Sequence, residues 1–332
     1  MRSLLANKKV QVGVNAGFGI VLLAVSILSA RHFAKMGWPL RHADPILVAA
    51  SCLLFLIAYA FKAWGWQRLF AEHERPTSAA LAFAGGAACV GGVALPGRVD
   101  DALRIACVKR FPGTRAGIGT LGISLIVLGM LDNAALTPMA TVAAADASSW
   151  TVQLGFAVIA AAGVAAAVVV AMLPKLGGWR RAMRFRVGRW LAEHTHCTRQ
   201  AIAAWFLISV SWALRGTAVF LLLSALSMRQ SFPLALAFLT ACAASAALPI
   251  APAGTATQAG AGAAILIASG VHTGDAIAFS VAAQAIVVVT GAAVVLLIGA
   301  WHVITRVRLG GPHFVPRFVP REVALAHEHP SR

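Results

Sequence analysis

The stretch GGAACVGGVALPGRVDDALR, residues 85–104, begins like a membrane-spanning helix and ends unlike one. Its first half is small and apolar, but Pro96 and Gly97 interrupt it, and proline ends a helix because it lacks an amide donor. Charged side chains at membrane depth are costly, so they are usually paired or functional. Four of them follow the break at once: Arg98, Asp100, Asp101 and Arg104. The stretch therefore predicts a broken helix with polar groups at its break.

The composition around this stretch is that of an integral membrane protein. Of the 332 residues, 59% are hydrophobic and only 12% are charged. A water-soluble surface needs more polar side chains than this. The net charge of +17 lies mainly in connecting segments, where membrane topology and anionic headgroups account for it without nucleic acid. The predicted fold class is all-α, a polytopic helical membrane protein.

Apolar runs of about 20 residues, the length that a helix needs to cross a bilayer, recur along the chain. Six of them are unbroken and predict full crossings: 10–30, 45–65, 118–138, 151–173, 201–226 and 275–304. Two further runs, 79–108 and 232–271, are interrupted by proline. The interruptions are Pro96 in the first run and Pro249 and Pro252 in the second. We expect each interrupted run to form a hairpin of two short helices.

Basic residues predict the orientation of these segments. The segment 175–199 is rich in arginine, so we expect it to be cytoplasmic and to rest on anionic headgroups. Both termini are then cytoplasmic, in a cell (inner or plasma) membrane, and each hairpin is re-entrant. The halves 1–140 and 148–306 then form an inverted repeat within a transmembrane domain, 1–311, followed by a disordered cytoplasmic tail, 312–332. The alternative is coincidence in an alanine-rich sequence.

The charges after the first break allow two interpretations. Arg98, Asp100, Asp101 and Arg104 could form a polar cluster at the hairpin turn, where arginine suits a lipid phosphate because its planar fork donates two parallel hydrogen bonds. Alternatively, residues 99–110 form an interfacial helix whose charges lie in water. Composition alone does not separate these alternatives.

A further arginine, Arg215, lies over halfway along the run 201–226. An arginine that faces lipid at this depth is improbable, so we expect it to face the interior. It would there pair with a substrate phosphate or with a carboxylate: Asp100, Asp101 or Asp132. The alternative is that its long side chain extends to the outer headgroups.

The second interrupted run carries no charge, and its polar groups are few. A helix that begins near Thr255 would direct its N-terminal amides into the membrane centre, which favours an anion. Gly254, Thr255 and Gln258 are the candidate contacts. Alternatively, Gly254, Gly260 and Gly262 serve close helix packing.

Two polar residues of the unbroken crossings have structural interpretations. We expect Asp132 to lie near the outer end of its helix in a capping or interfacial role, and Gln284 to make an interhelical hydrogen bond. The triplet His194, His196 and Cys197 is interpreted as a loop rather than a metal site. No motif for a metal, a nucleotide or another cofactor is predicted.

Two motifs resemble those of the transmembrane region of lysylphosphatidylglycerol synthases. The segment ALPGRVDDALRIACVKR, residues 94–110, is similar to the signature LPGR-x-G-E-x-x-R. The segment LPIAPAGTATQAGAGAAILIASGV, residues 248–271, is similar to the element P-x-x-P-G-G-x-G-x-R-E. Asp101 stands where a glutamate is usual, whereas Gln258 and Ala259 replace the usual arginine-glutamate pair. The remaining matches are Pro96, Gly97, Arg98, Arg104, Pro249, Pro252 and Gly254.

The resemblance implies a flippase-like membrane unit that moves lipids between leaflets. It covers the membrane unit only, so lipid aminoacylation is not expected and the chain is not interpreted as an enzyme. The partners are membrane lipids, with a phospholipid or lipid-linked amphiphile held between the two hairpins. Two other functions stay open: a membrane-embedded lipid-modifying enzyme, and a non-catalytic subunit of a lipid or glycan synthase. The sequence also does not decide whether the chain forms a homodimer.

Overall fold

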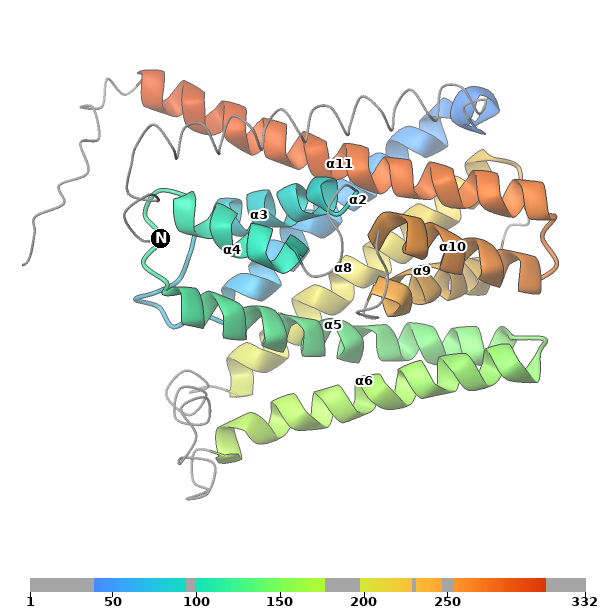
Figure 1. Cartoon of the computed structure of the whole chain (residues 1–332), viewed down its shortest axis with the longest axis horizontal. Coiled ribbons are helices and arrows are strands. Elements are labelled where there is room, and N and C mark those ends of the chain that lie inside the picture. Colours follow the sequence, from blue (N-terminus) through green and yellow to red (C-terminus); the bar gives the residue numbers. More distant parts are fainter. Residues whose placement is uncertain (1–38, 94–98, 177–197, 229–230, 247–253, 309–332) are drawn as a thin grey trace, which may run out of the picture.

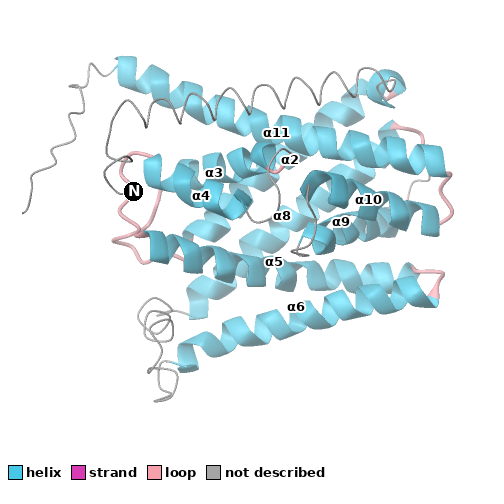
Figure 2. Cartoon of the chain, viewed as in Figure 1, coloured by secondary structure: helices cyan, strands magenta, loops and turns pink. Residues whose placement is uncertain are grey.

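The computed structural model of the chain describes residues 39–93, 99–176, 198–228, 231–246 and 254–308. Over these residues it is helical and contains no strand (Figure 2), which confirms the all-α fold class. The elements are η1 (Pro39–His42), α2 (Pro45–Gln67), α3 (Ser78–Gly91), α4 (Val99–Arg110), α5 (Ile118–Asp146), α6 (Trp150–Leu176), α8 (Thr198–Ala225), α9 (Phe232–Ala246), α10 (Gly254–Ala268) and α11 (Thr273–Arg308).

Five described helices are long and apolar enough to cross a membrane: α2, α5, α6, α8 and α11. They coincide with five of the six predicted crossings, and the sixth, 10–30, lies outside the described residues. Large apolar side chains such as Leu154, Val158 and Trp301 are exposed on their outer faces, as a lipid environment allows. The chain is therefore a multi-pass membrane protein.

The end of α5 differs from the prediction. The apolar run was expected to end at Pro138, but the helix continues through that residue to Asp146. Neighbouring hydroxyl groups bond to carbonyls around the proline, since Thr141 Oγ1 donates to the Pro138 carbonyl at 2.8 Å. Proline removes the amide donor of the Ala134 carbonyl, four residues earlier, but membrane helices tolerate proline, and the alanine-rich residues 139–146 favour helix.

The short helices form two packed pairs, α3 with α4 and α9 with α10. In Figure 1 the loop before α3 and the loop after α4 lie at one end of the molecule. The loops before α9 and after α10 lie at the opposite end. The predicted breaks lie outside the described residues, and with them Pro96, Gly97, Arg98, Pro249 and Pro252.

Helices α2 and α8 run antiparallel and side by side (Figure 1), and small and hydroxylated residues line their contact. A Cβ atom at Gly65 would lie 2.8 Å from Ile208 Cγ1, so only glycine allows this approach. Ser51 Oγ donates to the Ala218 carbonyl at 2.9 Å, and Ser211 Oγ donates to the Ala58 carbonyl at 2.8 Å. Buried hydroxyls bonded across a small-residue contact are typical of helix packing in membranes.

A second close contact joins α3 to α11 and yields a stability prediction. A Cβ atom at Gly86 would lie 2.6 Å from the Gly291 carbonyl oxygen, whereas one at Gly85 would have only Tyr59 Cδ1 nearby, at 3.9 Å. We expect Gly86→Ala to lower the free energy of unfolding by about 1–3 kcal/mol, because backbone must move. The control Gly85→Ala should be neutral or stabilising, because alanine favours helix. Thermal unfolding of both purified variants measures the difference, and equal unfolding temperatures would contradict the contact.

Candidate functional site

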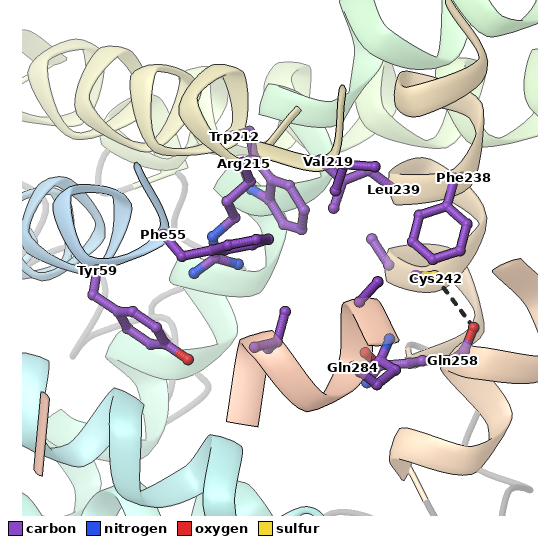
Figure 3. A pocket seen from close by; sticks show the side chains of 13 residues that line it. Phe55, Tyr59, Trp212, Arg215, Val219, Phe238, Leu239, Cys242, Gln258 and Gln284 are labelled. Carbon is purple, nitrogen blue, oxygen red and sulfur yellow. Dashed lines mark hydrogen bonds between the residues drawn. The ribbon is translucent and has the colours of Figure 1, made fainter. Parts of the chain in front are cut away.

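A cavity of about 80 Å³ lies inside the bundle, among α2, α8, α9, α10 and α11 (Figure 3). Its wall combines aromatic rings with a few polar side chains. The aromatic residues are Phe55, Tyr59, Trp212 and Phe238. The polar residues are Arg215, Cys242, Gln258 and Gln284. A mostly apolar cavity with a few convergent polar groups is the usual form of a small-molecule site.

Arg215 is the charged residue of this wall, held between two aromatic rings. Its Cζ atom lies 5.5 Å from the centre of the Tyr59 ring and 5.1 Å from that of Trp212. Its Nε atom is buried and has no hydrogen-bond partner among the described residues. A buried donor without an acceptor is unfavourable, so the guanidinium marks a place where a ligand oxygen would be stabilised.

Asp132 does not lie where the sequence predicted it. It stands in the middle of α5, not at its outer end, because the helix continues to Asp146. Its Oδ2 atom lies 2.8 Å from Lys62 Nζ, and its Oδ1 atom accepts a hydrogen bond of 2.8 Å from Trp212 Nε1. The capping interpretation was therefore wrong. Asp132 is engaged by these two groups and makes no ion pair with Arg215 in the described structure.

Lys62 was not among the candidate site residues predicted from the sequence, although its position in the sequence could have identified it. It stands within the apolar run 45–65, like Arg215 within its own run, and the same argument on charges at membrane depth applies to it. Its Nζ atom lies 5.5 Å from the centre of the Trp212 ring. Trp212 thus contacts both groups: its Nε1 atom donates to Asp132 of the ion pair, and its ring lies 5.1 Å from Arg215 Cζ in the cavity wall.

The charges of the first motif form a separate cluster at the start of α4. Arg104 bonds to Asp101 at 3.0 Å and contacts Asp100 at 3.5 Å. The three side chains are between 27% and 47% exposed, and none of them lines the cavity. Carboxylates in the first turn of a helix are stabilised by the helix dipole. The dipole and the contacts with Arg104 therefore account for the two aspartates without a bound ligand. Arg98 lies outside the described residues.

The second motif reaches the cavity through α10. The helix begins at Gly254, with Thr255 in its first turn, and Gln258 one turn further lines the cavity. Cys242 Sγ donates to the backbone carbonyl of Gln258 at 3.2 Å, which ties α9 to α10 beside the cavity (Figure 3). Gln284 of α11 is only 9% exposed and lines the same cavity.

The glycines of α10 differ in what surrounds them. A Cβ atom at Gly262 would collide with the Phe238 ring and lie 2.9 Å from Cys242 Sγ, while Gly260 has open space around it. Close packing therefore explains Gly262 and not Gly260. Phe238 and Cys242, which pack on Gly262, also line the cavity with Gln258.

Comparison with known proteins connects this architecture to a family. No curated protein and no solved structure matched the chain. The family model described as lysylphosphatidylglycerol synthase TM region matches residues 12–299, a range that includes α2 to α10 and most of α11. The resemblance seen in the two motifs is thereby confirmed, and the chain belongs to the family of the lysylphosphatidylglycerol synthase transmembrane region.

Proposed function

We propose that this chain is a flippase-type transporter that moves a phospholipid or lipid-linked amphiphile between leaflets without modifying it. The family and the helical spans support a lipid-related role in the membrane. The observation that carries the proposal is Arg215, a cation inside the bundle whose Nε atom lacks an acceptor in the described structure. A lipid phosphate supplies oxygens that an arginine fork binds well.

The size of the cavity supports a site for a headgroup, with the acyl chains left in the bilayer. A volume of about 80 Å³ is several times the roughly 10–15 Å³ that a cavity needs to hold one water, which leaves room for a phosphate group. The N-terminus of α10 favours an anion, because its free backbone amides and the helix dipole attract negative charge. This end of the helix is close to the cavity, since Gln258 in the second turn lines it. Gly254 and Thr255 belong to this first turn and are proposed as backbone contacts of the phosphate.

The packing of the helices supports an inverted repeat with two re-entrant hairpins. If α2 corresponds to α8 and α3, α4 and α5 correspond to α9, α10 and α11, contacts in one half have counterparts in the other. The contact of α3 with α11 matches that of α9 with α5, and the contact of α4 with α5 matches that of α10 with α11. Inverted repeats of this kind place broken helices beside the substrate of many transporters.

The re-entrant arrangement predicts which loops share a side of the membrane. In a variant without native cysteines, single cysteines at Glu72 and Arg115 should react with an impermeant thiol reagent from one side only, the cytoplasmic side. Cysteines at Ser148 and His272 should react only from the opposite side. All four native residues are exposed. Labelling of Glu72→Cys and Arg115→Cys from opposite sides would show that α3 and α4 together cross the membrane once.

Reconstitution of the purified chain in liposomes tests the transport function. Phosphatidylglycerol with a labelled acyl chain should change leaflets faster than in empty liposomes, and chromatography should recover it chemically unchanged. A modified lipid would favour the membrane-embedded enzyme. Neither movement nor modification, in a preparation shown to be folded, would favour the non-catalytic synthase subunit.

A further inference from the structure

We infer that the cavity selects an anionic lipid phosphate with an uncharged, hydroxyl-bearing substituent, and that it excludes aminoacylated, cationic headgroups. This inference rests on the proposed function and names its substrate class. It concerns the part of the headgroup beyond the phosphate.

The cavity lacks an available carboxylate. Within the described structure no acidic residue lines it. Asp132 does not line the cavity, and it already binds Lys62 and Trp212. The carboxylates of α4 are held by Arg104. An ammonium group that entered the cavity would lose water without gaining a counter-charge, which costs several kcal/mol.

The aromatic rings do not replace the missing carboxylate. A cage of aromatic faces can bind an ammonium group, but the rings of Tyr59 and Trp212 already face the Arg215 guanidinium at 5.5 and 5.1 Å. Trp212 also has Lys62 Nζ 5.5 Å from its centre. Lys62 is neutralised by Asp132, so a further cation would meet the one uncompensated positive charge of Arg215, and this repulsion works against cationic headgroups.

Two carboxamides stand where the substituent of the phosphate would lie. Figure 3 shows Arg215 on one side of the cavity and Gln258 and Gln284 on the other. A glutamine side chain both donates and accepts hydrogen bonds, as a hydroxyl group does. A phosphate bound at Arg215 would thus direct a glycerol, inositol or sugar substituent toward groups that complement its hydroxyls.

The sequence of α10 agrees with this assignment. Gln258 and Ala259 stand where the similar family element carries arginine and glutamate. The glutamate is the acidic group of that element, and alanine cannot replace its charge. The exchange removes one positive charge at the wall position 258 and one carboxylate at the next residue, which does not line the cavity, and it leaves a neutral carboxamide in the wall.

Competitive lipid binding to the full chain tests the inference without requiring transport. Purified protein in detergent is mixed with equal amounts of phosphatidylglycerol, phosphatidylinositol and lysyl-phosphatidylglycerol, and the bound lipids are quantified by native mass spectrometry. We expect the two anionic lipids to exceed the lysyl lipid by about tenfold or more, a difference of about 1.4 kcal/mol or more. Lysyl-phosphatidylglycerol bound equally well or better would overturn the inference.

A matched pair of variants assigns the selectivity to the cavity. Gln258→Glu places a carboxylate in the wall and should shift the ratio toward the lysyl lipid. Gln153→Glu adds the same charge at an exposed position of α6 and should leave the ratio unchanged. Equal ratios in the two folded variants would overturn the role of Gln258.

The liposome assay distinguishes this failure from failure of the proposed function. Translocation of all three lipids at equal rates would overturn the selectivity and support the transporter. Selective binding without translocation of any lipid would support the selectivity and refute the transporter.

Discussion

Asp132→Ala should destabilise the protein more than any other single change considered. The substitution leaves the Lys62 ammonium, 2.8 Å from the missing carboxylate, without its counter-ion, and it removes the acceptor of Trp212 Nε1. The pair is partly buried, with side chains 22% and 20% exposed, and breaking a fully buried ion pair on one side costs about 3–5 kcal/mol, which is the upper limit here. We expect a large loss of monodisperse protein in size-exclusion chromatography and a lower thermal unfolding temperature for what remains.

Two controls separate the ion pair from a general sensitivity of α5. Asp146→Ala removes an exposed carboxylate at the end of the same helix and should have no effect. The double variant Lys62→Met with Asp132→Leu replaces both charges by apolar groups, which is often close to neutral for a buried pair. It should recover most of the folded yield. A double variant as unstable as Asp132→Ala would show that the ion pair is not the cause.

The helices were largely predictable from the sequence because each membrane span is a long apolar run. The same runs conceal which face of a helix points inward, since a helix that is apolar all round has no polar face to identify. The ends were harder still. Pro138 was interpreted as the end of a crossing, and α5 passes through it. This error placed Asp132 at a helix end and hid its ion pair with Lys62.

The cavity could be predicted only in part. Arg215 and Gln258 were candidates because one is charged in an apolar run and the other belongs to a recognisable motif. Their neighbours Tyr59 and Trp212 carry no sequence signal, since they are brought together by the packing of α2 against α8. The first motif gave the opposite result: Asp100, Asp101 and Arg104 were candidates, but they pair with one another and do not line the cavity.

Arg215→Lys should slow lipid translocation strongly although the positive charge is kept. Lysine cannot donate two parallel hydrogen bonds to a phosphate, and it lacks the planar group that lies against Tyr59 and Trp212. Loss of one charge-assisted hydrogen bond, worth about 1.5–3 kcal/mol, predicts a decrease of about tenfold or more in the initial rate. Arg215→Gln, which also removes the charge, should abolish transport above the rate of empty liposomes.

These substitutions should affect transport far more than folding, in contrast to Asp132→Ala. Arg215 has no ion-pair partner among the described residues, so its removal leaves no carboxylate unpaired. The expected stability loss is the cation–π contribution, about 0.5–2 kcal/mol. Rates are therefore normalised to folded protein, and Arg115→Lys, the same change at an exposed loop position, serves as the control. If both Arg215 variants moved phosphatidylglycerol at the rate of the unaltered protein, the guanidinium would not bind the headgroup, and its place between two rings would be a feature of helix packing alone.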